Sequence, residues 1–185
     1  VDIQATVTNL SEGMFMDCTR LQNVILPDTL TTVDTGAFHK CKSLTTMTLP
    51  RGVTQINQYA FSNCVSLTEV SLSTALLTIG EDAFMDCTRL LKVTIPDKVE
   101  RIERGAFAGC TSLKEVTIGK GVKIIEIIAF YNCNALKRAN FRDTGKWRVT
   151  FSEHIWNYFT PTDAGTNATC LRKTYSSYDW EKVEK

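Results

Sequence analysis

The sequence FMDCTRL occurs twice in this chain, at residues 15–21 and again at residues 84–90. A string of seven residues rarely recurs by chance in a chain of 185, so it marks either a duplicated site or a repeated structural unit. The two copies start 69 residues apart, which is three times 23. A fixed period of roughly 20–50 residues is typical of solenoids and other repeat arrays.

The 23-residue period extends well beyond these two copies. We call the phenylalanines that follow it the phenylalanine ladder: Phe15, Phe38, Phe61, Phe84, Phe107 and Phe130. We call the cysteines that follow it the cysteine ladder: Cys18, Cys41, Cys64, Cys87, Cys110 and Cys133. Each ladder marks one position of a repeated unit.

A unit of this size has one apolar face that it cannot bury alone, so neighbouring units must stack. Within the unit, Leu-x-x-Val-x-Leu alternates apolar and polar residues, which favours a short strand with one buried face. Stacked strands would form a parallel sheet with about 4.8 Å between units. The sequence therefore predicts a solenoid in which the ladder phenylalanines contact one another and the ladder cysteines are buried, free thiols.

Residues 1–141 resemble the BspA-like (treponemal-type) leucine-rich repeat family, through the pattern C-x-x-L-x-x-V-x-L-P-x-x-V-x-x-I-x-x-x-A-F-x-x-C. The departures are Met14 in place of alanine, and Ser73 and Gly119 in place of proline. The resemblance implies a solenoid of the α/β superhelix class, with short parallel strands on the concave face, short strands or helical turns on the convex side, and a C-terminal cap. It also implies an extracellular or cell-surface adhesion protein whose ligand is a protein or glycan on a host or neighbouring cell.

The period suggests where the chain divides. It fits the first ten residues, so the chain starts inside a repeat, and we expect a fragment of a longer protein. The period fails after Phe141. We therefore expect a repeat array over residues 1–141, with a truncated first unit, and a C-terminal capping region over residues 142–185.

The C-terminal region has a composition of its own, since it holds all three tryptophans, Trp147, Trp156 and Trp180. The string TPTD at residues 160–163 predicts a helix near 161–176 with Thr160 as its N-cap. One apolar stripe follows on that helix: Ala164, Ala168, Leu171, Tyr175 and Tyr178. The last coil of a solenoid exposes an apolar end, so we interpret this region as its cap. The alternative is a carbohydrate-binding patch built from the tryptophans.

Composition excludes several classes of protein. The formal charge is +1, from 21 basic and 20 acidic residues with no basic stripe, so we expect no nucleic-acid partner. No apolar run approaches the roughly 20 residues that a membrane span needs. A zinc site needs ligands two to four residues apart, and the cysteines follow the period instead. We expect no metal and no cofactor.

Two patterns suggest catalysis without the required geometry. Asp-Thr-Gly, the tripeptide of aspartic proteases, occurs at residues 34–36 and 143–145. Nearly five units would separate the two carboxylates by about 23 Å, whereas a catalytic dyad shares a proton at about 3 Å. Cys41 lies near His39, but a thiol in an apolar ladder is inert. Cys170 lies off the ladder and is the candidate reactive thiol. The sequence thus predicts no catalytic residue and no enzyme.

Polar residues that alternate with the buried ones form two outward columns. The first is Asn23, Thr46, Glu69, Lys92, Glu115 and Arg138. The second contains Thr48, Ser71, Thr94 and Thr117. The alternating charges fit a ladder that relieves repulsion between strands, or a recognition strip for a ligand. Two functions remain: an extracellular binding module that uses the concave face, or a structural spacer that presents another domain and has no ligand.

Overall fold

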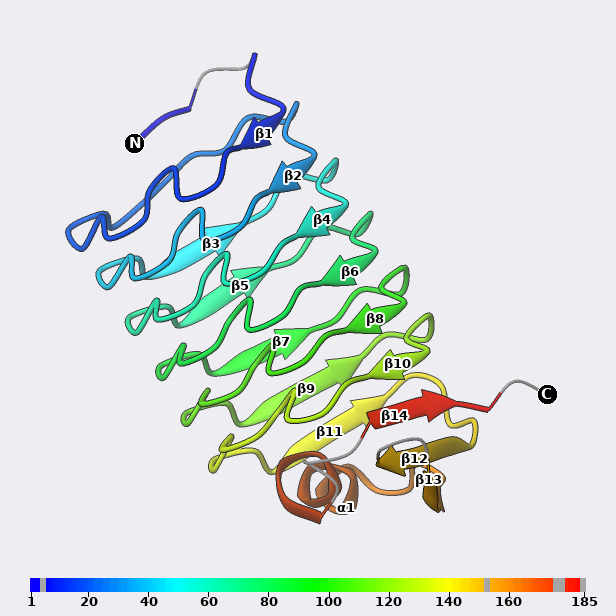
Figure 1. Ribbon diagram of the computed structural model, residues 1–185. Helices are drawn as coiled ribbons and strands as arrows, with labels where there is room; N and C mark the ends of the chain where they lie inside the picture. The colour runs from blue at the N-terminus through cyan, green and yellow to red at the C-terminus, as the bar shows by residue number, and fades with distance from the viewer. Residues whose placement is uncertain (4–5, 152–153, 175–178, 184–185) are drawn as a thin grey trace.

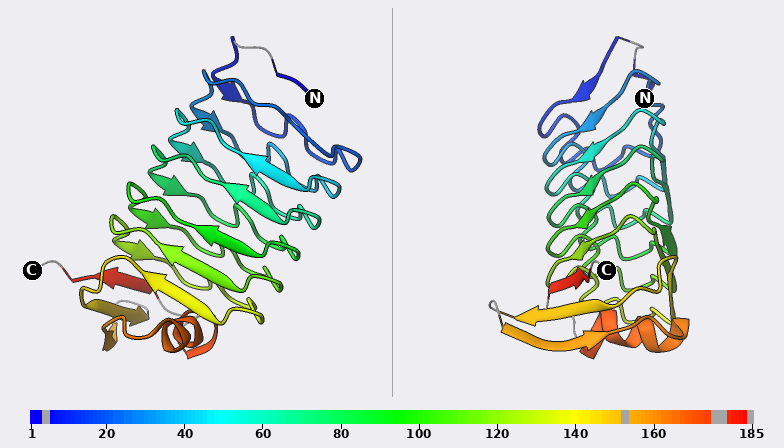
Figure 2. Two further views of the ribbon diagram at one scale, coloured as in Figure 1. Left: turned by 180° about the vertical axis from the view of Figure 1, so that it is seen from behind. Right: turned by 90° about the vertical axis from the view of Figure 1, so that its right-hand side faces the viewer.

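The computed structural model describes residues 1–3, 6–151, 154–174 and 179–183. The chain winds into a stack of similar coils, with the N-terminus at one end and the C-terminal elements at the other (Figure 1). Two sheets run along this stack and form two of its walls (Figure 2). The predicted parallel-strand solenoid is therefore confirmed.

The first sheet has five parallel strands in the order β11-β9-β7-β5-β3. Their bounds are Thr46–Thr48 for β3, Glu69–Ser71 for β5, Lys92–Thr94 for β7, Glu115–Ile118 for β9 and Arg138–Phe141 for β11. Each strand alternates as predicted: in β7, Val93 is buried between the exposed Lys92 and Thr94. Residues pair with their equivalents one unit on, as Thr46 does with Glu69.

The second sheet has the order β1-β2-β4-β6-β8-β10-β14-β12-β13. Its repeat strands are parallel and two residues long: Asn9–Leu10 for β1, Thr32–Val33 for β2, Gln55–Ile56 for β4, Thr78–Ile79 for β6, Arg101–Ile102 for β8 and Ile124–Ile125 for β10. Three strands of the C-terminal region extend it: Trp147–Phe151 for β12, His154–Phe159 for β13 and Asp179–Lys182 for β14. β14 pairs antiparallel with β10, so the parallel order ends there.

The phenylalanine ladder runs through the core between the two sheets. Adjacent rings lie 5.1 to 5.3 Å apart between centroids, with interplanar angles of 1° to 10°. The rings from Phe38 to Phe130 are buried, whereas Phe15 in the first coil is half-buried. The predicted ring contacts are thus confirmed along the whole ladder.

The cysteine ladder is bonded in a way that its spacing does not reveal. The Cys41 thiol donates to the Phe15 carbonyl of the preceding coil at 3.1 Å, and Cys64 donates to that of Phe38 at 3.2 Å. The remaining ladder thiols repeat the bond at 3.1 to 3.3 Å. All seven cysteines are free, as predicted for the ladder. Cys18 contradicts the expected burial because it lies in the outermost turn of the stack and is exposed.

Two further columns hold left-handed backbone at every coil. One is Gly13, Gly36, Tyr59, Asp82, Gly105 and Ile128, and the other is Asp17, Lys40, Asn63, Asp86, Gly109 and Asn132. Their φ angles lie between 51° and 73°. Glycine, asparagine and aspartate tolerate this conformation, which explains nine of these twelve residues; Lys40, Tyr59 and Ile128 adopt it at a cost. These columns flank the phenylalanine ladder and turn the chain from one sheet to the other.

The tail helix α1, Ala164–Thr169, begins three residues later than the TPTD string predicts. Its N-cap is Asp163, not Thr160, because the Asp163 carboxylate accepts the backbone N–H groups of Gly165 and Thr166 at 3.0 and 2.9 Å. A π-helical segment, Cys170–Thr174, continues it. Of the predicted stripe, Ala168 and Leu171 are buried and Ala164 is half-buried, while Tyr175 and Tyr178 lie outside the described residues.

The C-terminal region packs against the last coil. The buried Asn167 side chain donates to the Ala139 carbonyl of β11 at 3.0 Å. Trp147 and Trp180 are each 1% exposed and lie 5.6 and 6.4 Å from the Phe141 ring. Burial of these two indoles contradicts the alternative of an aromatic carbohydrate patch that includes them; the side chain of Trp156 lies outside the described ones.

Candidate functional site

The outward side chains of β3, β5, β7, β9 and β11 form a surface that we call the five-stranded face. Nine of the ten predicted binding residues lie on its strands: Thr46, Thr48, Glu69, Ser71, Lys92, Thr94, Glu115, Thr117 and Arg138. Asn23 precedes β3 by one unit and lies outside the strands. Most of the nine are exposed, and Glu115 and Thr117 are half-buried.

Glu115 is the centre of the charged column on this face. Lys92 lies 3.3 Å away on one neighbouring strand and Arg138 lies 2.7 Å away on the other, and Asn140 donates to the same carboxylate at 3.1 Å. Burial alone would raise the pKa of Glu115, but hydrogen bonds from Lys92 and Arg138 hold that pKa below its usual value. The column is therefore a charge ladder at this end, which is one of the two interpretations left open by the sequence.

The sheet is interrupted between β5 and β7. β3 pairs with β5, and β7 with β9, over three residue pairs each, whereas β5 and β7 share only the pair Glu69 and Lys92. Beyond those strands, Leu49 N donates to Ser71 O at 2.9 Å and Ile95 N donates to Thr117 O at 2.8 Å. Among the described residues, the equivalent bond from Leu72 N to Thr94 O is not formed.

Burial changes at the same place. Leu72 is half-buried, whereas its equivalents Leu49 and Ile95 are 4% and 0% exposed. Val70, in the middle of β5, is 7% exposed, and its equivalent Val93 in β7 is 1% exposed. Solvent therefore reaches the edge of the core between these two strands.

Ser73 lies just after β5 and distinguishes this coil from its neighbours at the interruption. It stands where Pro50 and Pro96 stand in the neighbouring coils. Its hydroxyl donates to the Arg51 carbonyl of the preceding coil at 2.9 Å and accepts the backbone N–H of Ala75 at 3.1 Å. Proline has no hydroxyl, so the coils that contain Pro50 and Pro96 lack this bond to the preceding coil.

An open groove of about 850 Å³ lies over the interruption, and we call it the β5–β7 groove. Its floor is apolar, from Val70, Leu72, Leu91 and Pro96, and Leu91 is 45% exposed. Its rim is polar and contains four predicted residues, Glu69, Ser71, Lys92 and Thr94, together with Thr68, Thr74, Asp97, Lys98 and Arg142. In the sequence, the one sign of this groove is Ser73 in place of proline. That departure alone did not predict a groove.

An ion pair between Arg142 and Asp97 lies on the rim of the groove. Arg142 directly follows β11. Its guanidinium lies 2.9 Å from the Asp97 carboxylate, two coils earlier. The same carboxylate accepts the backbone N–H of Lys120 at 3.1 Å. The bond from Lys120, followed by the one from Arg142, holds the pKa of Asp97 below its usual value. This network gives the groove a fixed wall at its far end.

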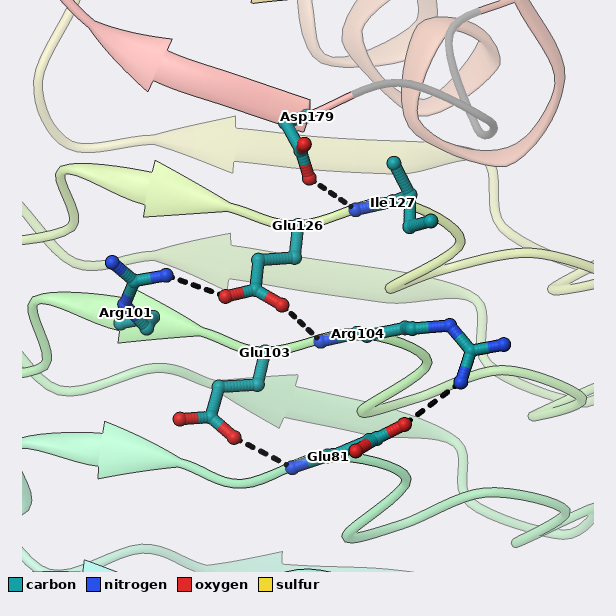
Figure 3. Close-up of polar contacts among 7 residues, drawn as sticks. All are labelled: Glu81, Arg101, Glu103, Arg104, Glu126, Ile127 and Asp179. Carbon is teal, nitrogen blue, oxygen red and sulfur yellow. Dashed lines mark hydrogen bonds and ion pairs between the residues drawn. The ribbon is translucent and has the colours of Figure 1, made fainter. Parts of the chain in front are cut away.

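A second polar cluster lies at the turn after the second sheet (Figure 3). Glu103 and Glu126 accept the backbone N–H groups of Glu81 and Arg104, each at 3.0 Å. Arg104 also pairs with Glu81 at 2.7 Å, and Arg101 pairs with Glu126 at 2.5 Å. Every carboxylate in this cluster already has a partner within the protein. We therefore interpret it as a structural ladder.

The residues of the two catalytic patterns are engaged elsewhere. Asp34 accepts the Asn57 side chain at 2.8 Å, and Asp143 pairs with Lys182 in the C-terminal region. Burial raises the pKa of Cys41 to about 12 and lowers that of His39, so this thiol stays protonated beside a weak base.

The described part of the chain offers neither a reactive thiol at Cys170 nor a metal cluster. Cys170 is buried, and burial raises its pKa, which contradicts the prediction of a reactive thiol there. The described residues contain no group of three side chains that could hold a metal ion. They also contain no helix long and apolar enough to span a bilayer.

Comparison with known proteins agrees with this architecture. The family described as BspA type Leucine rich repeat region matches residues 1–111 and 77–148, in six copies. A leucine-rich repeat protein of T. pallidum is similar, with 28% identity and a TM-score of 0.71 over 76% of this chain and 68% of that one. One from Eubacterium ventriosum has 28% identity and a TM-score of 0.70 over 74% of this chain and 37% of that one. A comparison with curated proteins gave no match.

The matches to the family cover most of the chain and the whole of the observed stack. Both solved structures share the fold at a TM-score of 0.70 or above. The matched residues contain the phenylalanine and cysteine ladders and the five-stranded sheet. This chain belongs to the BspA-type leucine-rich repeat family.

Proposed function

We propose that this chain is an extracellular or cell-surface adhesion module that binds a protein or glycan ligand through the five-stranded face. Leucine-rich repeat solenoids typically bind proteins, so membership of the family supports protein binding as the general function. Binding, rather than catalysis, is the function that we assign to the chain.

The observation that carries the proposal is the coincidence of the β5–β7 groove with four residues of the predicted columns. Glu69, Ser71, Lys92 and Thr94 line its rim, and an apolar floor lies between them. A recognition surface needs apolar area that a partner can bury and polar groups that fix its orientation. Other parts of the five-stranded face offer polar side chains over a closed sheet.

The chemistry of the thiols is compatible with an oxidising medium. Six of the seven cysteines are buried, and burial is the first cause of the raised pKa of Cys41, Cys64, Cys87 and Cys170. Buried, protonated thiols react slowly with oxidants and disulfides. The surface location itself rests on the family resemblance.

The test is direct binding of the purified chain to a panel of extracellular-matrix proteins and cell-surface glycans. One variant replaces Glu69, Lys92, Glu115 and Arg138 by alanine. A matched control replaces the same number of acids and bases away from the face: Glu81, Arg104, Glu100 and Lys123, which form two ion pairs of 2.7 and 3.2 Å. Circular dichroism first checks that both variants are folded.

Saturable binding that the face variant loses and the control keeps would support the proposal. Equal binding by both variants would move the site off the five-stranded face and overturn that part of it. If the wild-type chain binds nothing in the panel, the spacer becomes the better account.

A further inference from the structure

The β5–β7 groove has unused backbone hydrogen-bonding groups as well as an apolar floor. The repeat points Leu72 N–H and the Thr94 carbonyl at each other, as the bonds from Leu49 to Ser71 and from Ile95 to Thr117 show in neighbouring coils. In this coil they do not bond. A backbone donor and acceptor that face a groove are the groups with which a sheet takes up an extended peptide.

The charges of the rim are not balanced along its length. Where β5 and β7 begin, Glu69 lies opposite Lys92, so the two signs compensate. At the other end Asp97 already pairs with Arg142, which leaves Lys98 exposed and, among the described residues, without an ion pair. With Glu69 set against Lys92 and Asp97 against Arg142, Lys98 is the uncompensated charge among the described residues that line the groove.

We propose that the β5–β7 groove binds an extended, acidic peptide segment of a partner protein. The peptide carbonyl accepts the Leu72 N–H, its N–H donates to the Thr94 carbonyl, and an apolar side chain covers Leu72 and Leu91. A carboxylate next to that side chain lies against Lys98. This inference rests on the proposed function and narrows it to one groove and one kind of ligand.

Ser73 holds the groove open in this proposal, since its hydroxyl ties the end of β5 to Arg51. Ser73→Pro restores the residue of the neighbouring coils and removes the tether. We expect it to close the sheet, so that the Leu72 amide bonds to Thr94. Hydrogen exchange of the Leu72 amide should be fast in the wild-type chain, compared with Leu49 and Ile95, and slow in Ser73→Pro. Slow exchange in the wild-type chain would overturn the proposal.

The binding test uses two blocked hexapeptides, Asp-Thr-Val-Leu-Thr-Asp and Lys-Thr-Val-Leu-Thr-Lys, with maltohexaose as a glycan probe. Each is titrated into ¹⁵N-labelled chain while amide shifts are followed. We expect the acidic peptide to shift the Leu72 amide saturably, and the lysine peptide to bind about tenfold more weakly. Lys98→Ala should weaken binding of the acidic peptide, and Lys123→Ala, which precedes β10 of the other sheet, should not.

Three outcomes would overturn the proposal: no peptide shifts the Leu72 amide, the two peptides bind equally, or only maltohexaose shifts it. Failure here is separable from failure of the proposed function. If a panel protein binds the five-stranded face and the acidic peptide does not displace it, the face is a binding surface and the groove is not its site. Displacement by the acidic peptide alone would support both.

Discussion

Asp179 accepts the backbone N–H of Ile127 at 2.8 Å, across the junction between β14 and the last coil (Figure 3). Glu81 and Arg104 are the equivalents of Ile127 in the two preceding coils, and glutamates accept their backbone N–H groups. Glu103 accepts from Glu81 N, and Glu126 accepts from Arg104 N, each from the coil before its own. Asp179 therefore takes the place that the carboxylate of a next coil would occupy, although its strand runs antiparallel to β10.

We predict that Asp179→Ala destabilises the chain, because it leaves the half-buried Ile127 N–H without its acceptor. The expected loss is about 1–2 kcal/mol in the free energy of unfolding, measured by urea denaturation. Asp179→Asn keeps an acceptor oxygen and is the control. If alanine and asparagine have the same effect, the bond to Ile127 does not stabilise the junction. The capping role of residues 142–185 stays a prediction that this experiment tests.

The pH dependence of the same residue has a defined sign. Burial, followed by the approach of Glu126, raises the pKa of Asp179, against the bond from Ile127, which lowers it. A carboxyl whose pKa is higher in the folded than in the unfolded chain favours folding as it takes up its proton. Its contribution to stability should therefore rise as the pH falls from the folded pKa toward the unfolded value of about 3.8. Subtracting the Asp179→Asn profile from that of the wild-type chain isolates this contribution, and a difference of opposite slope would contradict it.

The phenylalanine ladder should be most sensitive in its middle. Phe84 is fully buried and stacks at 5.1 and 5.2 Å on the rings before and after it. Phe84→Ala should cost about 3–5 kcal/mol, the usual range for a buried aromatic ring. Phe15→Ala should cost distinctly less, because Phe15 is half-buried and has one stacked neighbour in the ladder, Phe38. Equal losses of unfolding free energy for the two variants, measured by thermal unfolding, would show that burial and stacking of each ring do not determine its contribution to stability.

The left-handed columns predict a difference between two glycines. Gly36 and Gly105 have φ angles of 61° and 62°, so alanine at either position should cost about 1–2 kcal/mol. At Gly105 a Cβ atom would also meet the Asp82 carboxylate at 2.0 Å, whereas at Gly36 it meets the end of the Met16 side chain at 3.1 Å. Gly105→Ala should therefore be the more harmful, and adding Asp82→Ala should remove the excess. If the double variant is as unstable as Gly105→Ala alone, the loss of stability comes from the left-handed backbone and not from the contact with Asp82.

The thiols should divide into one reactive group and six unreactive ones. Cys18 is exposed, while the other ladder cysteines and Cys170 are buried. A thiol-specific chromogenic reagent at pH 8 should titrate one cysteine quickly in the folded chain and all seven in guanidinium. Cys18→Ser should abolish the fast reaction. A second fast thiol in that variant would contradict the burial of Cys170.

The repeat array was predictable because its signal recurs. A position that is phenylalanine in six successive units leaves one interpretation, and the coil, the alternating strands and the ring contacts all follow from it. The thiol bonds and the left-handed columns could not be predicted in this way. Each thiol bonds to a carbonyl one coil away, and that partner is known only once the coils are stacked. The φ columns mix glycine with tyrosine and isoleucine, which hides them from a composition-based search.

The C-terminal region and the groove each occur once in the chain. Because neither recurs, no periodic pattern in the sequence predicts its structure. The TPTD string predicted Thr160 as the N-cap, whereas the structure has Asp163 in that role, since its carboxylate accepts the backbone N–H groups of Gly165 and Thr166. The pairing of β12 with β13 and β14 joins segments without a common motif. Ser73 was visible as a departure from proline, but its bond to the Arg51 carbonyl depends on the position of the preceding coil.

The coil-to-coil bonding also determines how the chain would respond to mechanical load. The backbone bonds between successive coils, such as Phe38 N to Ala60 O at 2.7 Å, lie along the axis of the stack. Tension along that axis would open the bonds of one coil before those of the next. Each coil holds 23 residues in about 4.8 Å of stack and would release a strand of about 80 Å when it unwinds. Pulled from its ends, the molecule would lengthen in steps while its remaining coils stay folded, as an extensible tether does.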